Sequence, residues 1–418
     1  MIDRRSFLAG SGVGLASLLG DRSAFAGALA RLAPVLSESS AKSLAEDYLL
    51  EPGLLYLNHG SIGTIPRVVH EEHVRLLRQC EKNPHIHMWG DVWVEALAKT
   101  RSAAAGLLRC EADEVALTHN TTEGFNVLAQ GLPLGKGDEV LFSRLNHPSA
   151  SEPWSYYATR RGYSVRKFDI PLDDITGLRV ADVVQMHERE IRPETRVLVF
   201  PHVDNIVGLR HPTRELVAMA KRRGVAFVAV DVAQSLGMMP VNVAAEDADF
   251  YAASPHKWVQ APKGVGLLVV RRRVQEQLDP LWVKRPRSTM PKTAEVFEDY
   301  STRNLPAVLA LADAIAFQQR LGEGSKETRL LEIAGWFRDL VDATPSLAWR
   351  SARQRELSSS LFAVGLRKGD AREVERRLAT AHDIMVRPFA PPLNTLRVSP
   401  NLINTRADAD RFVAALNG

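Results

Sequence analysis

The stretch VDVAQSLGMMPVNVAAEDADFYAASPHKWVQAPKGVGLLVV, residues 230–270, decides the fold of this chain. It begins at the end of one apolar run, Val225–Val230, and contains two more, Asp249–Ala253 and Gly264–Val270. Short apolar runs bounded by turn residues are typical of buried strands in an α/β sheet. The stretch therefore predicts three strands of one sheet.

Two polar residues stand where these predicted strands end. Asp231 follows the first run, and Lys257 follows the second within Ser254-Pro255-His256-Lys257. Ligands of such sheets bind at the carboxyl ends of the strands, so a carboxylate and an amine should converge on one crevice. This pair suits pyridoxal 5'-phosphate (PLP), with Lys257 forming the Schiff base and Asp231 facing the pyridine nitrogen. The competing interpretations are a surface-turn aspartate and a solvated lysine.

A phosphate site is predicted on another segment. The apolar run Val115–Thr118 leads through His119 and Asn120 into Thr121 and Thr122, which open a helix. Hydroxyl and free N–H groups at a helix N-terminus form an anion site. A plain threonine cap is the alternative. The candidate phosphate donors further along the chain are Ser254 and His256.

Three more polar residues follow predicted strands. Asn205 and Gln234 stand at neighbouring strand ends and could reach the phenolic oxygen of the cofactor. His147, in Asn146-His147-Pro148, could stack on the ring, although a lone histidine is more often a surface residue. Their positions after predicted strands make these three residues candidates for contacts with the cofactor.

The whole chain predicts an α/β fold with a mostly parallel, doubly wound, seven-stranded sheet. Its expected strands are Val115–Thr118, Glu139–Ser143, Ser164–Phe168, Arg196–Phe200, Val225–Val230, Phe250–Ala253 and Val265–Val270. A proline- and arginine-rich region, Val283–Lys292, marks a junction between lobes. Beyond it, two long helices and three short strands predict a smaller C-terminal α+β domain. We expect the site where the two lobes meet.

The N-terminus has the three parts of a bacterial twin-arginine export signal. Arg4 and Arg5 precede an apolar stretch, Ala9–Leu19, and Ala24-Phe25-Ala26 forms a cleavage pattern. A disordered tail is the alternative. We expect a periplasmic or extracellular protein, and no other stretch reaches the ~18 apolar residues that span a bilayer.

Composition excludes several classes of function. The 418 residues carry a net charge of +4 without a long basic block or an aromatic stripe, which argues against nucleic-acid binding. Two cysteines, Cys80 and Cys110, imply no disulfide framework. The pair His85 and His87 is by itself weak evidence for a set of metal ligands, so no metal is expected.

Together these motifs resemble the class V aminotransferase family of fold-type I PLP enzymes, over nearly the whole chain after residue 50. The family includes cysteine desulfurases, isopenicillin N epimerase and related C–S lyases. The motifs are Thr121-Thr122-Glu123, His147, Asn205-x-x-Gly208, Asp231-Val-Ala-Gln234, Ser254-Pro-His256-Lys257 and Lys263-Gly264-Val265-Gly266. The resemblance implies the cofactor roles given above.

The resemblance also implies residues that the local pattern does not indicate. Arg397, in Leu396-Arg397-Val398, matches the arginine that binds the substrate carboxylate, and a bidentate guanidinium suits that task. Asn58 and His59, in the opening motif, are candidates for substrate binding. Thr302 lies in a segment, 297–304, that family members donate to the partner's phosphate, so a homodimer with shared sites is implied. A surface arginine is the alternative for Arg397.

The expected divisions are a signal peptide (1–26), an N-terminal segment packing on the small domain (27–65), a large PLP-binding domain (66–304) and the small domain (305–418).

One departure from the family narrows the activity. The region 387–392, shortly before Arg397, contains no cysteine, whereas desulfurases need a nucleophilic one there. Three motifs look closer to the isopenicillin-N-epimerase-like branch: Tyr56-Leu57-Asn58-His59-Gly60-Ser61, Asn83-Pro84…Met88-Trp89 and Thr302-Arg303-Asn304. We therefore expect epimerisation or transamination at Cα of an amino acid or small amine. The alternatives are a C–S or β-elimination lyase and an exported, non-catalytic ligand-binding or scaffold homologue.

Overall fold

The computed structural model describes residues 22–31, 41, 44–89 and 91–417. The predicted twin-arginine motif and its apolar stretch lie outside these residues. The predicted cleavage pattern at 24–26 falls within helix α3 (Ser23–Arg31). None of the described helices is both long and apolar enough to cross a membrane.

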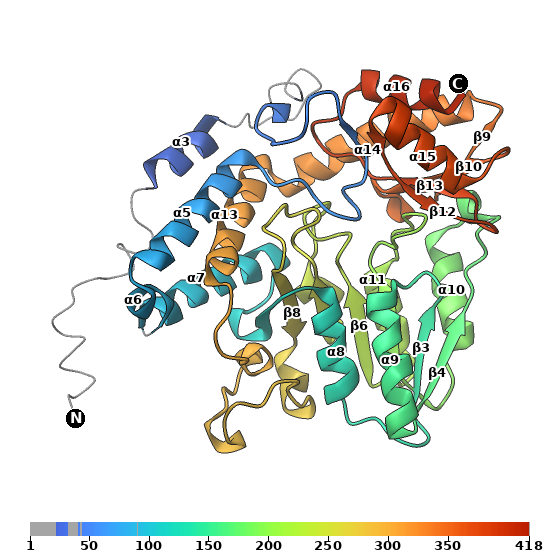
Figure 1. Cartoon of the computed structure of the whole chain (residues 1–418). Coiled ribbons are helices and arrows are strands. Elements are labelled where there is room, and N and C mark those ends of the chain that lie inside the picture. The colour runs from blue at the N-terminus through green and yellow to red at the C-terminus, as the bar shows by residue number, and fades with distance from the viewer. Residues whose placement is uncertain (1–21, 32–40, 42–43, 90, 418) are drawn as a thin grey trace.

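A seven-stranded sheet forms the centre of the large lobe (Figure 1). Its spatial order is β2-β8-β7-β6-β5-β3-β4, and β8 alone runs antiparallel to its two neighbours. The strands are β2 (Val115–Thr118), β3 (Glu139–Ser143), β4 (Ser164–Phe168), β5 (Thr195–Pro201), β6 (Phe227–Asp231), β7 (Phe250–Ala253) and β8 (Gly266–Val270). The mostly parallel, doubly wound sheet is confirmed.

Both faces of this sheet are buried, which explains why its strands are continuous apolar runs. Successive residues of β6 alternate between two cores: Val228 and Val230 join one, and Phe227 and Ala229 join the other. Helices α8 (Thr121–Gly131) and α9 (Pro148–Arg161) cover one face (Figure 1). The helices over the other face are α7 (Asp91–Leu108), α10 (Val180–Glu190), α11 (Thr213–Arg222) and α13 (Leu305–Leu321).

The small lobe contains a four-stranded antiparallel sheet of order β12-β13-β10-β9. Its strands are β9 (Leu347–Trp349), β10 (Phe362–Leu366), β12 (Arg387–Phe389) and β13 (Thr395–Val398). Its helices are α14 (Glu323–Asp342), α15 (Ala371–His382) and α16 (Arg406–Asn417). In addition, β1 (Leu55–Tyr56) pairs in parallel with β11 (Ile384–Met385). The N-terminal segment is thus joined to the small lobe.

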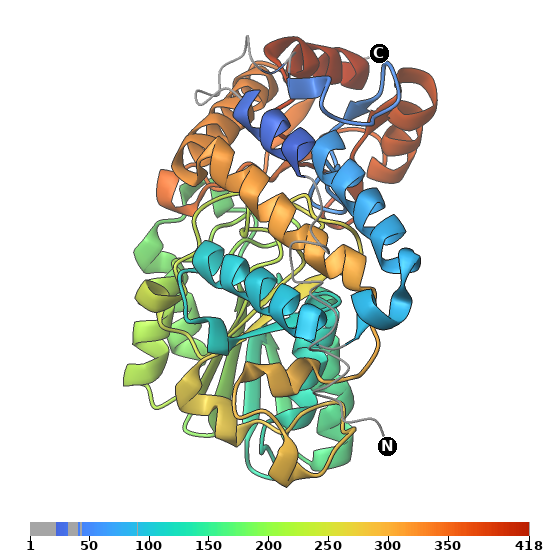
Figure 2. The same cartoon turned by 90° about the vertical axis from the view of Figure 1, so that its left-hand side faces the viewer.

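Helix α13 lies between the lobes and begins at the expected boundary between the two domains. It packs against α5 (Arg67–Lys82) and α7, and Figure 2 shows it crossing the molecule beside them. Its buried side chains belong to the core of the large lobe, and the separate core of the small lobe begins within α14. The boundary expected at 304/305 therefore precedes a helix that packs with the large lobe.

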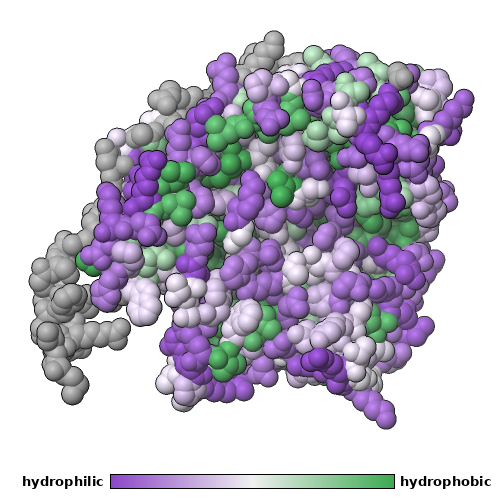
Figure 3. Space-filling model, in the orientation of Figure 1, coloured by the Kyte–Doolittle hydropathy of each residue, from purple (hydrophilic) through white to green (hydrophobic). Residues whose placement is uncertain are grey.

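Two further short helices are α6 (Pro84–Met88) and α12 (Val243–Glu246). The surface seen in Figure 3 is mostly hydrophilic, with apolar residues in small separate groups.

Candidate active site

The carboxyl ends of adjacent strands bring the predicted residues together. Asp231 ends β6, where it lies level with Pro201 of β5 and Ala252 of β7. The chain leaves β7 at Ala253 and reaches Lys257 four residues later. One pocket at this edge is lined by His147, Pro201, Val203, Asn205, Asp231, Ala233, Gln234 and Lys257. The predicted convergence of a carboxylate and an amine is present.

Burial sets the electrostatics of this pair. Asp231 is buried, which raises its carboxyl pKa, while Lys257 and the N–H of Ala233 act in the opposite direction. The N–H of Ala233 donates to Asp231 Oδ1 at 2.9 Å. Burial lowers the pKa of Lys257 to about 8, although the charge of Asp231 raises it. The lysine therefore carries a substantial fraction of free amine near neutral pH.

His147 forms another wall of the pocket. It caps α9, and its Nδ1 accepts from the backbone N–H of Ser149 at 3.1 Å. This acceptor role requires an unprotonated Nδ1. Burial, followed by the charges of Lys257, Arg397 and Arg387, lowers the pKa of His147 to about 4. A neutral ring at the mouth of the pocket can stack on a planar cofactor.

The loop that carries Asn205 is held by a buried aspartate. Asp204 accepts three backbone N–H groups, from Ile206 at 2.7 Å, Val207 at 2.8 Å and Leu209 at 2.6 Å. The side-chain oxygen of Asn205 is buried without a hydrogen-bond partner among the described residues. The loop thus presents an unsatisfied amide to the pocket.

The predicted phosphate donors meet at the start of α8. The Thr121 backbone N–H donates to Ser254 Oγ at 3.1 Å, and the two hydroxyls lie 2.8 Å apart. Thr122 is exposed, and its hydroxyl donates to Ser149 at 2.8 Å. Nearby, His256 has a buried Nδ1 without a partner in the described chain. Hydroxyls and helix N–H groups from two segments therefore gather at one helix N-terminus.

Two predicted residues make contacts that the sequence did not indicate. Gln234 donates to the Gly60 carbonyl at 2.8 Å and accepts from the Trp258 indole at 2.9 Å. Both ends of its amide are thus engaged by protein, and its reach to a phenolic oxygen stays a prediction. His59 is fully buried, with its ring nitrogens 3.2 Å from Ser399 O and 3.1 Å from Thr64 Oγ1.

Arg397 lies on β13, across from the pocket, and is 3% exposed. It donates to the Asn205 carbonyl at 3.1 Å, to Asn58 Oδ1 at 2.7 Å and to Ser61 Oγ at 2.5 Å. Its Nε is buried with no partner in the described part of the chain. These partners are neutral, so the guanidinium keeps its charge for an anion. Burial and the charge of Arg387 lower its pKa to about 10, and the residue stays protonated.

The Aminotransferase class-V family profile matches residues 55–412. The chain belongs to that family. Isopenicillin N epimerase of Streptomyces clavuligerus is 31% identical over 88% of this chain and 96% of the relative. The Amycolatopsis lactamdurans enzyme of the same name is 30% identical over 89% and 96%. A probable cysteine desulfurase of Pyrococcus abyssi is 26% identical over 90% and 96%.

Solved structures show that the fold is that of this family. A complex between the cystine C–S lyase C-DES and its product, cysteine persulfide, superposes with a TM-score of 0.79 at 21% identity, covering 87% of this chain and 97% of that one. The cysteine desulfurase CsdA of Escherichia coli gives 0.78 at 23% identity, covering 92% and 98%. The predicted fold-type I architecture and the family resemblance are confirmed.

The residues of this class V chain fit PLP. Asp231 supplies a buried carboxylate for a protonated ring nitrogen, and Lys257 supplies the amine. Asn205, on the loop after β5, and His256, on the loop of Lys257, each have a buried atom without a partner among the described residues, and a polar cofactor could supply one. The hydroxyls of Thr121 and Ser254 lie at a helix N-terminus suited to a phosphate.

Thr302, assigned to a partner's phosphate by resemblance, is exposed in this single chain. Its neighbour Arg303 instead points inward, donating to the Leu117 carbonyl at 3.2 Å and pairing with Glu298. Thr302 is not among the residues that line the pocket of its own chain. Its role in a partner's site stays a prediction.

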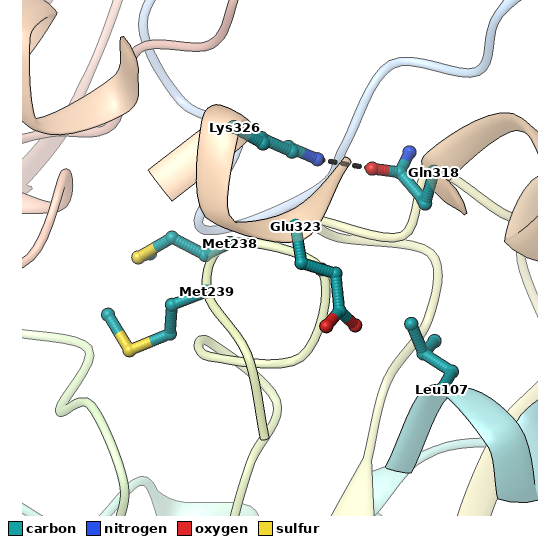
Figure 4. A pocket seen from close by; sticks show the side chains of 7 residues that line it. Leu107, Met238, Met239, Gln318, Glu323 and Lys326 are labelled. Atoms are coloured by element: carbon teal, nitrogen blue, oxygen red, sulfur yellow. Dashed lines mark hydrogen bonds between the residues drawn. The ribbon is translucent and has the colours of Figure 1, made fainter. Parts of the chain in front are cut away.

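A second pocket is lined by residues of α7, α13 and α14 and by Gly237, Met238 and Met239. Figure 4 shows Lys326 pointing toward Gln318, with Glu323, Met238 and Met239 around it. The Lys326 amine is 2% exposed and donates to Gln318 Oε1 at 2.5 Å and to the Trp258 carbonyl at 2.9 Å. Burial lowers its pKa to about 7. Because Trp258 follows Lys257, this amine supports the loop that carries Lys257.

Sequence reasoning missed Asp204, Ser61 and Arg387. Asp204 has a local signal, since an aspartate before a turn that contains Gly208 commonly accepts nearby backbone N–H groups. Ser61 and Arg387 have none, because their relation to Arg397 depends on segments far apart in the chain.

Proposed function

We propose that the protein acts at Cα of an amino acid or small amine, by epimerisation or transamination, with PLP as its cofactor. The observation that carries the proposal is the joint position of Asp231 and Lys257 in one pocket, with Arg397 near enough for its charge to act on Lys257. The presence of isopenicillin N epimerases among the relatives supports the choice of Cα chemistry.

PLP supplies an electron sink that acidifies the Cα–H bond of an amine joined to it. Asp231 holds a proton at the ring nitrogen, since a buried carboxylate is stabilised by a cationic N–H. Lys257 moves a proton at Cα, and its pKa of about 8 suits both uptake and release near neutral pH. Arg397 binds the substrate carboxylate and so orients Cα toward Lys257.

The proton's destination separates the two reactions. If Lys257 or a group across the pocket returns the proton to Cα on the opposite side, the product is the other enantiomer. If Lys257 does not return the proton to Cα, PLP would supply the site that retains the amino group, and the substrate would leave as a keto acid. Asn58 and Ser61 serve both outcomes by holding Arg397 in place.

Persulfide-forming desulfuration is not supported by the thiols of this chain. Cys80 is buried on α5, and burial raises its pKa to about 11. Cys110 is partly buried, and its pKa is raised to about 12 for the same reason. Neither residue lines the pocket of Asp231 and Lys257. Both thiols therefore stay protonated away from the site.

The deciding experiment follows Cα–H exchange in D2O by NMR, with the PLP-loaded protein and each L- and D-amino acid. Exchange with loss of optical activity selects epimerisation, keto-acid formation selects transamination, and sulfide or ammonia with a keto acid selects a lyase. Lys257→Ala should abolish exchange, while the exposed Lys136→Ala should not. If the protein takes up no PLP and exchanges no substrate, a ligand-binding homologue is the better description.

We further propose that the protein is exported by the twin-arginine route and works as a homodimer. The leader pattern at Arg4-Arg5 supports the first, and the exposure of Thr302 supports the second. Replacing both arginines by lysine should retain the protein in the cytoplasm on fractionation. Thr302→Ala should weaken PLP binding in a protein that stays dimeric on light scattering.

A further inference from the structure

Two arginines face each other across neighbouring strands of the small lobe. Arg387 on β12 pairs with Arg397 on β13 in the antiparallel ladder. Residues directly opposite in such a ladder point to the same face of the sheet, with Cβ atoms about 4.5–5.5 Å apart. Like charges in this arrangement destabilise the sheet. Something other than sheet stability must therefore favour the pair.

Neither guanidinium forms an ion pair in the part of the chain that the structure describes. The charge of Asp204 does act to raise the pKa of Arg397 against the larger effect of burial, but this carboxylate is hydrogen-bonded to three backbone N–H groups. The hydrogen bonds of Arg397 go to a backbone carbonyl, an amide and a hydroxyl, and its Nε has no partner. Arg387 is exposed and takes part in no described ion pair or hydrogen bond. Many other arginines of the described chain contact a carboxylate, as Arg101 does with Glu298 at 2.6 Å. The two arginines leave two positive charges available at one face.

That face belongs to the active site. Arg387 is one of three cations whose charges act on the His147 ring, with Lys257 and Arg397. His147 lines the pocket that contains Lys257 and Asp231. Asp231, on the far side, is the only carboxylate among the residues lining that pocket. Because the charges of Lys257, Arg397 and Arg387 all act on His147, a substrate held by Lys257 and Arg397 would lie near Arg387.

We propose that Arg387 binds a second acidic group of the substrate, so that the enzyme prefers amino acids with a carboxylate on the side chain. This inference rests on the proposed function, in which Lys257 engages the amine and Arg397 the α-carboxylate. Arg387 then determines specificity: its fork of N–H donors matches a carboxylate, and its exposure lets the side chain follow ligands of different length. Protection of an edge strand would also explain a charged residue on β12, but not a position opposite Arg397.

The first test compares ligands that differ only in the distal charge. Equilibrium dissociation constants of the holoenzyme are measured by spectral titration with L-glutamate and L-glutamine, and with L-aspartate and L-asparagine. The holoenzyme should bind at least one acid about tenfold more tightly than its amide. In Arg387→Gln this advantage should disappear, with binding of the amide unchanged. The matched control is Arg376→Gln, an exposed arginine of α15, which should keep the preference.

The second test needs no reaction. Glutarate and its monoamide, which lack the amine, are titrated into the holoenzyme by calorimetry, and glutarate should bind more tightly in an Arg387-dependent manner. Arg387-dependent glutarate binding without any Cα–H exchange would reject the proposed function and leave the acidic subsite standing. Normal exchange without a preference for acids, or a preference that survives in Arg387→Gln, would overturn the inference. Loss of the dimer in Arg387→Gln would also overturn it, by placing the arginine at a subunit interface.

Discussion

Arg397 donates to the side chain of Asn58 at 2.7 Å, across 339 positions of the chain. The N-terminal segment therefore holds the residue that we assign to the substrate carboxylate. The same segment reaches the loop of Lys257, since the N–H of Gly63 donates to the His256 carbonyl at 2.9 Å. Residues 58–63 thus join the two lobes at the site.

Replacing Asn58 should weaken substrate binding more than turnover. Asn58→Ala removes a hydrogen bond to a charged group, so KM should rise about tenfold with a smaller change in kcat. Asn58→Asp should raise KM further, because the new carboxylate would pair with Arg397 in place of the substrate. Steady-state kinetics with the best substrate measure both. Equal KM values in the alanine and aspartate variants would contradict this account of Arg397.

A methyl group at Gly63 should disturb the lysine loop. A Cβ there would lie 1.8 Å from the Lys257 carbonyl oxygen and 2.7 Å from that of His256. Gly63→Ala must therefore shift this backbone, and PLP affinity should fall. The matched variant Gly106→Ala adds a Cβ with nothing within 4 Å and should bind PLP normally. Fluorescence titration of the apoprotein with PLP compares the two.

The rate of PLP uptake by the apoprotein should increase with pH. The pKa of Lys257 is about 8, and only its neutral amine attacks the PLP aldehyde. The rate should therefore rise from pH 7 and level off above pH 8. In Asp231→Asn the midpoint should move to lower pH, because the carboxylate that raises this pKa is gone. Stopped-flow measurement of the uptake rate against pH compares the two proteins. The same midpoint in both would show that the charge of Asp231 does not act on the pKa of Lys257.

Asp204 should contribute strongly to stability. Asp204→Ala would leave three backbone N–H groups in a buried loop without their acceptor, and we expect a loss of about 3 kcal/mol in the free energy of unfolding. Asp204→Asn keeps an acceptor oxygen and should lose less. Urea unfolding of the apoprotein measures both values. The exposed Asp173→Ala serves as the control. If Asp204→Ala lost less unfolding free energy than this control, water would have replaced the carboxylate as the acceptor of the three N–H groups.

Lys326 should make stability depend on pH. Its pKa is about 7 in the folded protein and 10.5 when unperturbed, so between these values the unfolded chain binds the additional proton. The contribution of Lys326 to the free energy of unfolding should therefore increase from pH 7 toward 10.5 and be smallest below 7. Comparing the wild type with Lys326→Met by urea unfolding at several pH values isolates this effect. An equal difference at pH 7 and pH 10 would contradict the buried, neutral amine.

Local patterns were sufficient for most of the large sheet. Strands such as Phe250–Ala253 and Glu139–Ser143 coincide with apolar runs because both faces of the sheet are buried. The short strand β9 was missed, since Leu347–Trp349 is three residues long and has no periodicity to detect. The neighbours of α13 could not be predicted either, because an apolar helix indicates burial without indicating what it packs against.

Within the site, the sequence by itself determined which polar residues follow strands: Asp231 and Lys257 are apparent because each comes directly or shortly after an apolar run. Parallel strands in one sheet must end at one edge, and so these residues had to converge. Only the tertiary structure decided that Gln234 is held between Gly60 and Trp258, and that Arg387 faces Arg397. Those contacts join segments far apart in the chain, and their register depends on packing between lobes rather than on any local pattern.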